Sequence, residues 1–91
     1  MTPASKKQSK KTMNYGQSQA LKVLAAHRLG IGTIYVNDST EMLMGKDVHP
    51  TTFAAVEKEA ARINNILAQD VAKIAKANEI VITLLGEYGF E

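Results

Sequence analysis

The chain of 91 residues is long enough for one domain with a modest hydrophobic core. It contains no cysteine, which excludes disulfides and thiolate metal sites, and no apolar run approaches the roughly 18 residues that a membrane span needs. The formal net charge of +2 is unevenly divided, because residues 1–37 carry six bases and no acid whereas residues 38–91 carry five bases and nine acids. The net charges are therefore +6 for residues 1–37 and −4 for residues 38–91. This separation of charge bears on which partners the protein binds and not on its fold.

The first twelve residues hold four lysines and no large apolar side chain after Met1. They cannot bury enough surface to offset the entropy of ordering them, so we predict a disordered basic tail over residues 1–12 and a single helical domain over residues 13–91. No apolar segment follows the lysines, which excludes a secretory signal. With no cysteine present, we expect a reducing intracellular location, cytoplasmic or virion-associated.

Three elements are predicted before residue 46. Apolar residues recur at helical spacing from Ser18, a suitable N-cap, to Leu29, and Gly30 then ends the helix. The β-branched and aromatic run of residues 32–36 is typical of a strand. Asp38-Ser39-Thr40-Glu41 has the spacing of a capping box, which predicts a short middle helix that Gly45 ends.

The strongest pattern begins at Pro50, a residue suited to a first helical turn. No glycine or proline interrupts residues 51–78, and we predict one central amphipathic helix from Thr51 to Lys76, about 40 Å long. The apolar face of this helix is larger than the other predicted elements can cover. We therefore predict a dimer or higher oligomer. The predicted interface comprises Phe53, Val56, Ala60, Ile63, Leu67, Val71 and Ile74.

The short apolar run Ile80–Leu85 is rich in β-branched residues and predicts a second, buried strand. The sequence therefore predicts a mainly α protein with a small β component, an α+β fold. It would contain a short N-terminal helix, a short middle helix, one long helix and two short strands.

The chain shows no arrangement of residues typical of catalysis, so we expect no enzyme and no cofactor. Asp47 and His49 supply only two of the three or four ligands that a metal site needs. We therefore predict no metal site, and expect these two residues to cap or line the start of the long helix. Asp70 borders the apolar face of the predicted long helix. Polar groups in such a position more often fix the register between helices than take part in catalysis, and we predict the first role for Asp70.

Two segments resemble known families. Residues 48–56 resemble the turn and recognition-helix start of helix-turn-helix proteins, which implies DNA contact, although Lys46 and Asp47 replace the usual apolar residue and glycine. Residues 50–85 with the lysine-rich tail resemble the outline of the histone fold, which implies an obligate dimer. Asn78 and Glu79 stand where histones place basic residues.

Two functions remain open. The first is a non-enzymatic, self-associating protein acting next to DNA or RNA, either as a DNA-associated factor or as a structural subunit of a nucleoprotein or virus-like assembly. Phosphate would be contacted without sequence preference by six bases, Lys6, Lys7, Lys10, Lys11, Lys22 and Arg28. The alternative is an adaptor or inhibitor whose acidic C-terminal body binds a protein partner. Neither function involves a membrane.

Overall fold

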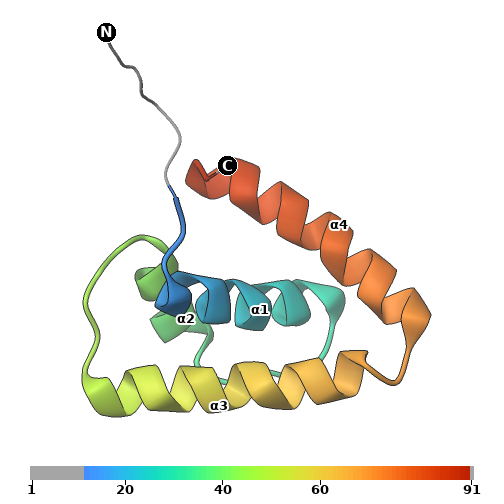
Figure 1. The fold of residues 1–91 in the computed structure, drawn as a ribbon, viewed down its shortest axis with the longest axis horizontal. Helices are drawn as coiled ribbons and strands as arrows, with labels where there is room; N and C mark the ends of the chain where they lie inside the picture. The colour runs from blue at the N-terminus through green and yellow to red at the C-terminus, as the bar shows by residue number, and fades with distance from the viewer. Residues whose placement is uncertain (1–11, 91) are drawn as a thin grey trace, which may run out of the picture.

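The structure is a computed structural model that describes residues 12–90. Within that range the chain forms four α-helices: α1 (Tyr15–Leu29), α2 (Val36–Leu43), α3 (Pro50–Leu67) and α4 (Val71–Tyr88). Figure 1 shows α1 between α3 on one side and α4 on the other, with α2 beside one end of α1. The arrangement is flat, with extents of 46 × 32 × 16 Å, and α1 is the common packing partner of the other three helices. Of the predicted tail, residues 1–11 lie outside the described residues, and Thr12 is exposed.

Helix α1 begins three residues before the predicted start. Asn14 and Gln17 form a reciprocal capping box, in which Gln17 N donates to Asn14 Oδ1 at 2.8 Å and Asn14 N donates to Gln17 Oε1 at 3.1 Å. The predicted C-terminal end is confirmed. Gly30 follows Leu29 with φ 99°, a left-handed conformation that favours glycine.

The predicted strand at residues 32–36 is wrong. Tyr35 has φ 64° and ψ 29°, a left-handed conformation that a strand does not contain, and α2 starts at Val36. Asp38 consequently lies inside the first turn of α2 and not at its N-cap. The helix itself is confirmed, and it buries Ser39, Met42 and Leu43.

The single helix predicted over residues 51–76 is two helices in the structure. Its start at Pro50 is confirmed, and His49 caps it by accepting a hydrogen bond from Thr51 N to Nδ1 at 3.0 Å. Helix α3 ends at Leu67, however, and α4 begins after Asp70, whose Oδ1 accepts hydrogen bonds from Ala72 N and Lys73 N at 3.1 and 3.3 Å. Asp70 is therefore an N-cap, a role that favours chain reversal over continuation of a helix.

The second predicted strand is also wrong, because residues 80–85 belong to α4. The reversal at residues 68–70 brings Ala77 and Leu84 of α4 against α1, where they are 5% and 1% exposed. Packing on one helix face outweighs the modest β propensity of Ile80, Val81 and Ile82. Over residues 12–90 the fold is thus all-α and not α+β.

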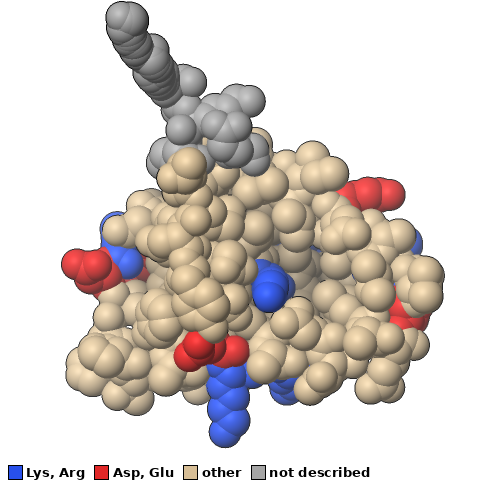
Figure 2. Space-filling model, viewed as in Figure 1, with Lys and Arg blue, Asp and Glu red and all other residues tan. Residues whose placement is uncertain are grey.

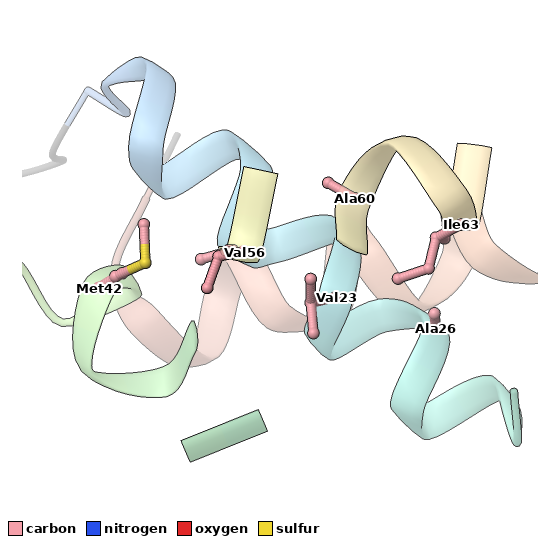
Figure 3. Packing of buried hydrophobic residues seen from close by; sticks show 7 residues of the cluster. Val23, Ala26, Met42, Val56, Ala60 and Ile63 are labelled. Carbon is pink, nitrogen blue, oxygen red and sulfur yellow. The ribbon is translucent and has the colours of Figure 1, made fainter. Parts of the chain in front are cut away.

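Helix α1 contributes to two groups of buried side chains. One lies between α1 and α3 and extends to Met42 of α2 (Figure 3); its fully or nearly fully buried members are Ala20, Val23, Ala26, Met42, Val56, Ala60 and Ile63. The other lies between α1 and α4 and contains Leu21, Leu24, Ala25, Leu43, Leu84 and Phe90. Because α1 is buried from both sides, α3 and α4 each keep an outer face.

The fold departs from both resemblances. Residues 44–49 separate α2 from α3, a longer connection than the three or four residues of a helix-turn-helix. The outline of the histone fold needs a β segment after a long central helix, whereas residues 80–85 are helical and α3 ends at Leu67.

Candidate interaction surface

The predicted phosphate-contacting residues fall into two sets. Lys6, Lys7, Lys10 and Lys11 lie outside the described residues. Lys22 is half-buried on α1, and Arg28 is near the C-terminal end of the same helix.

Arg28 is held by a two-pronged ion pair with Glu87 of α4. Its Nη1 and Nη2 donate to the two carboxylate oxygens at 3.0 and 2.7 Å. The hydrogen bonds to Glu87 raise the pKa of Arg28, and the same bonds lower the pKa of Glu87. The charge of Arg28 is therefore matched within the domain, where it joins α1 to α4.

The described part of the chain has no basic excess. Residues 12–90 contain seven Lys or Arg and eight Asp or Glu, a net charge of −1. Figure 2 shows acidic and basic groups interspersed among uncharged residues, with no large patch of one sign on the face in view. Arg28, Arg62 and Lys73 lie within 4 Å of a carboxylate. The four lysines of residues 1–11 therefore carry the positive excess of the protein.

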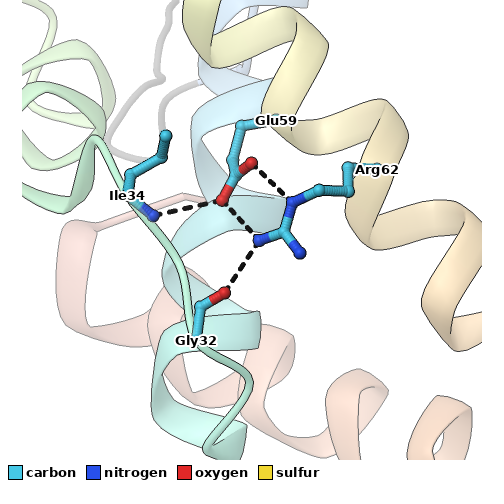
Figure 4. A network of polar contacts seen from close by, with 4 residues as sticks. All are labelled: Gly32, Ile34, Glu59 and Arg62. Carbon is cyan, nitrogen blue, oxygen red and sulfur yellow. Dashed lines mark hydrogen bonds and ion pairs between the residues drawn. The ribbon is translucent and has the colours of Figure 1, made fainter.

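A buried carboxylate organises the polar contacts between α3 and the loop before α2 (Figure 4). Glu59, 5% exposed, accepts from Arg62 Nε and Nη2 at 2.8 and 2.7 Å and from Ile34 N at 3.1 Å. Arg62 Nη2 also donates to Gly32 O at 2.7 Å. These bonds lower the pKa of Glu59, chiefly through Arg62, although burial opposes the shift. The network anchors the loop to α3, and both carboxylate oxygens of Glu59 accept hydrogen bonds within it.

The predicted oligomer interface is divided by the break between α3 and α4. Val56, Ala60 and Ile63 are fully buried against α1, and Phe53 and Leu67 pack against the same core. These residues belong to the core of the domain. Val56, Ala60 and Ile63 have no exposed surface with which to contact a second copy. Val71 and Ile74, in contrast, lie on α4 and are 81% and 37% exposed.

Helix α4 has an apolar side that the protomer does not cover. We call Val71, Ile74, Ala75, Asn78 and Ile82 the α4 outer face; all five are exposed, and Ile82 is 70% exposed. Val71, Ala75, Asn78 and Ile82 follow one another at steps of four, three and four, which places them on one side of a helix. Leu84 and Ala77 occupy the opposite side against α1.

An apolar groove of about 280 Å³ adjoins this face, between α1, the end of α3 and α4. Leu21, Ala25, Leu67, Ala77 and Val81 supply most of its apolar lining, and Lys22 is the charged residue among those that line it. Asn78 belongs both to the groove and to the α4 outer face. The exposed apolar surface therefore continues from the outside of α4 towards α1.

The histidines and acids do not converge on a metal site in the part of the chain that the structure describes. His49 is occupied as the N-cap of α3 and His27 is exposed on α1. Among the helices of residues 12–90, none is both long and apolar enough to cross a membrane.

No protein-family model matches this sequence, and no curated protein or solved structure is similar to it at a significant level. The α4 outer face is thus known from the geometry of this chain alone. Sequence reasoning missed it because it joined α3 and α4 into one helix. The signal that separates them is Asp70 followed by Ala72 and Lys73, an N-cap placed before a helical segment.

Proposed function

We propose that this protein is a non-enzymatic, self-associating helical protein that acts next to nucleic acid, with the lysines of residues 1–11 contacting phosphate groups. The separation of charge carries the proposal. The domain of residues 12–90 has a net charge of −1, and four lysines precede it within six residues. A short basic segment on a nearly neutral domain attracts phosphate without reading base sequence. In a subunit of an intracellular nucleoprotein or of a virus-like assembly, the basic segment would contact phosphate and the domain would self-associate.

A second candidate function is favoured by the α4 outer face. An exposed apolar helix face is typical of a site for another protein. If that protein is not a second copy of this chain, the molecule is an adaptor or inhibitor. The two functions differ in whether nucleic acid is bound at all.

Replacing Lys6, Lys7, Lys10 and Lys11 with glutamine should abolish salt-dependent binding to duplex DNA. Each phosphate that a lysine neutralises contributes about −0.9 to the slope of log affinity against log salt concentration, so four lysines predict about −3.5 for each copy. Non-specific affinities of this kind are commonly ~10⁻⁴–10⁻⁶ M. Fluorescence anisotropy with a labelled duplex over a series of salt concentrations measures both quantities.

The matched control replaces four exposed lysines of the domain, Lys46, Lys58, Lys73 and Lys76, with glutamine. We expect this variant to keep the slope of the unaltered protein, since the domain has no basic excess. A slope reduced equally by both sets of substitutions would refute a role special to the N-terminal lysines. Absence of binding to DNA and RNA at low salt would favour the adaptor function.

A further inference from the structure

We propose that two copies of this protein exchange their α4 helices, so that α4 of each copy packs on α1 of the other. The inference rests on the self-association in the proposed function and assigns it an interface. That interface consists of the contacts that α4 makes within one copy, formed instead between two copies. The exchange does not depend on contact with nucleic acid.

The way in which α4 is attached to the domain is the first argument. Among the described residues, the buried cluster around Val56 and Ile63 of α3 has no member from α4, and the cluster around Leu84 of α4 has none from α3. Helix α1 lies between these two helices (Figure 1). Helix α4 therefore separates as a unit without opening the core between α1 and α3, and α4 of a second copy fits the place that it leaves.

The connection between α3 and α4 is already close to helical. Ala68 has φ −60° and ψ −17°, and its N donates to Asn64 O at 2.9 Å, the pattern of an α-helix. Asp70 N donates to Leu67 O at 3.0 Å, as in a 3₁₀ turn. Asp70 itself is extended, with φ −149° and ψ 102°. A change of backbone conformation centred on Asp70 therefore turns the chain reversal into a straight passage.

The residues of the connection suit both arrangements. They include no glycine or proline, which favours a helix. The reversal is favoured by Asp70, whose Oδ1 accepts hydrogen bonds from Ala72 N and Lys73 N. In a straight passage these two N–H groups donate instead to the carbonyl oxygens of Ala68 and Gln69, four residues earlier. The backbone hydrogen bonds are thus exchanged and not lost.

The apolar face of α3 continues in phase across the connection. Its positions follow one another at steps of four, four and three, which is one side of a continuous helix: Ile63, Leu67, Val71 and Ile74. Because the chain reverses within one copy, Val71 and Ile74 are cut off from this face and are 81% and 37% exposed. A straight passage returns both side chains to the line of Ile63 and Leu67, beside the point at which α4 of the second copy enters.

Exchange preserves the contacts that hold α4 in place. Leu84 packs against Leu21 and Leu24 of α1 in either arrangement, and the ion pair of Arg28 with Glu87 then joins two copies. Domain swapping of this kind is a low-cost route to a dimer. Association still costs translational and rotational freedom, so we expect the exchanged dimer at high protein concentration and the monomer on dilution.

The first experiment divides the ion pair between two variants. In the pure Arg28→Glu variant every contact of α1 with α4 brings two acids together, and in the pure Glu87→Arg variant it brings two bases together. An exchanged dimer with one copy of each variant contains two matched pairs. After the variants are unfolded together in urea and refolded, native mass spectrometry should show mixed dimers in about ten-fold excess over random pairing.

The control mixes Lys58→Glu with Glu41→Lys, which makes the same charge changes at exposed residues that have no ion pair among residues 12–90. This mixture should pair at random. The double variant Arg28→Glu/Glu87→Arg restores the pair in every arrangement and should dimerise as the unaltered protein does. Random pairing in the test mixture would show that α1 and α4 of one copy stay together, and would overturn the exchange.

The second experiment alters the connection and measures the dissociation constant by sedimentation equilibrium. Asp70→Ala removes the cap that favours the reversal in both copies and should strengthen the dimer about thirty-fold. Gln69→Gly disfavours a helical connection in both copies and should weaken it about ten-fold. Thermal unfolding at low concentration shows whether each variant remains folded. A dissociation constant that neither change alters would overturn the role of the connection.

The outcomes separate the exchange from the proposed function. Dimers that pair at random in the mixing experiment would overturn the exchange and leave self-association standing. A strictly monomeric unaltered protein would overturn both, while the DNA experiment above would still decide the role of the lysines.

Discussion

Replacing Ile63 with alanine should lower the free energy of unfolding by about 2–5 kcal/mol. Ile63 has no exposed surface and belongs to the buried cluster between α1 and α3, where shortening the side chain leaves a cavity. A domain of this size has a stability of only about 5–15 kcal/mol, so this single change removes a large part of it. Urea unfolding followed by the helical circular dichroism signal measures the loss.

The control is Ile34→Ala, which removes the same atoms from a side chain that is 60% exposed. It should change the free energy of unfolding by no more than about 0.5 kcal/mol. Equal losses in the two variants would mean that α3 does not bury Ile63 against α1.

Glu59→Ala should cost about 1–3 kcal/mol at neutral pH, more than any other removal of a single acidic side chain from the domain. The carboxylate is 5% exposed and accepts three hydrogen bonds, one from Ile34 N and two from Arg62. Without it Ile34 N loses its acceptor and Arg62 its partner. The loop that follows α1 should then exchange its amide hydrogens faster.

The same contacts predict how stability depends on pH. Because the folded pKa of Glu59 is lowered, chiefly by Arg62, its contribution is fully present above the unfolded pKa, near 4.3. That contribution is lost as the pH falls through the folded pKa. The difference between the unaltered protein and Glu59→Gln should therefore be largest at neutral pH and shrink under acidic conditions.

Unfolding of both proteins in urea at neutral and acidic pH measures this difference. Glu41→Gln is the control, because Glu41 is exposed on α2. It should show little effect at either pH. A difference between the unaltered protein and Glu59→Gln that grew as the pH fell would contradict a carboxylate stabilised in its charged form.

Local signals predicted several helix ends correctly. Gly30 ends α1 because its left-handed backbone conformation closes the last turn. Pro50 opens α3, and His49 caps it as expected of a side chain at the start of that helix. These features depend on a few neighbouring residues, which is why sequence patterns reveal them.

The elements that sequence reasoning predicted wrongly depend on contacts between distant parts of the chain. Residues 80–85 are β-branched and apolar, yet Leu84 is buried against α1 only if this run is helical. The turn at residues 68–70 contains no glycine or proline. Folding back there gives α4 a packing partner that a continuous 40 Å helix would lack.

The same error shaped the prediction of the interaction surface. Periodicity correctly identified an apolar face, but it could not divide that face between the core and the outside. Val56, Ala60 and Ile63 pack within the protomer, whereas Val71 and Ile74 lie after the turn and are exposed. The lysines of residues 1–11 were evident from composition alone, since charge separation needs no tertiary information.

The central proposal is that the lysines of residues 1–11, and not the bases of the domain over residues 12–90, bind the phosphate groups of nucleic acid. The most direct test compares the salt dependence of DNA binding by the unaltered protein and by the variant in which Lys6, Lys7, Lys10 and Lys11 are replaced with glutamine. The unaltered protein should give a slope of about −3.5 for each copy, and the variant a slope near zero. Identical slopes for the two proteins would contradict the proposal.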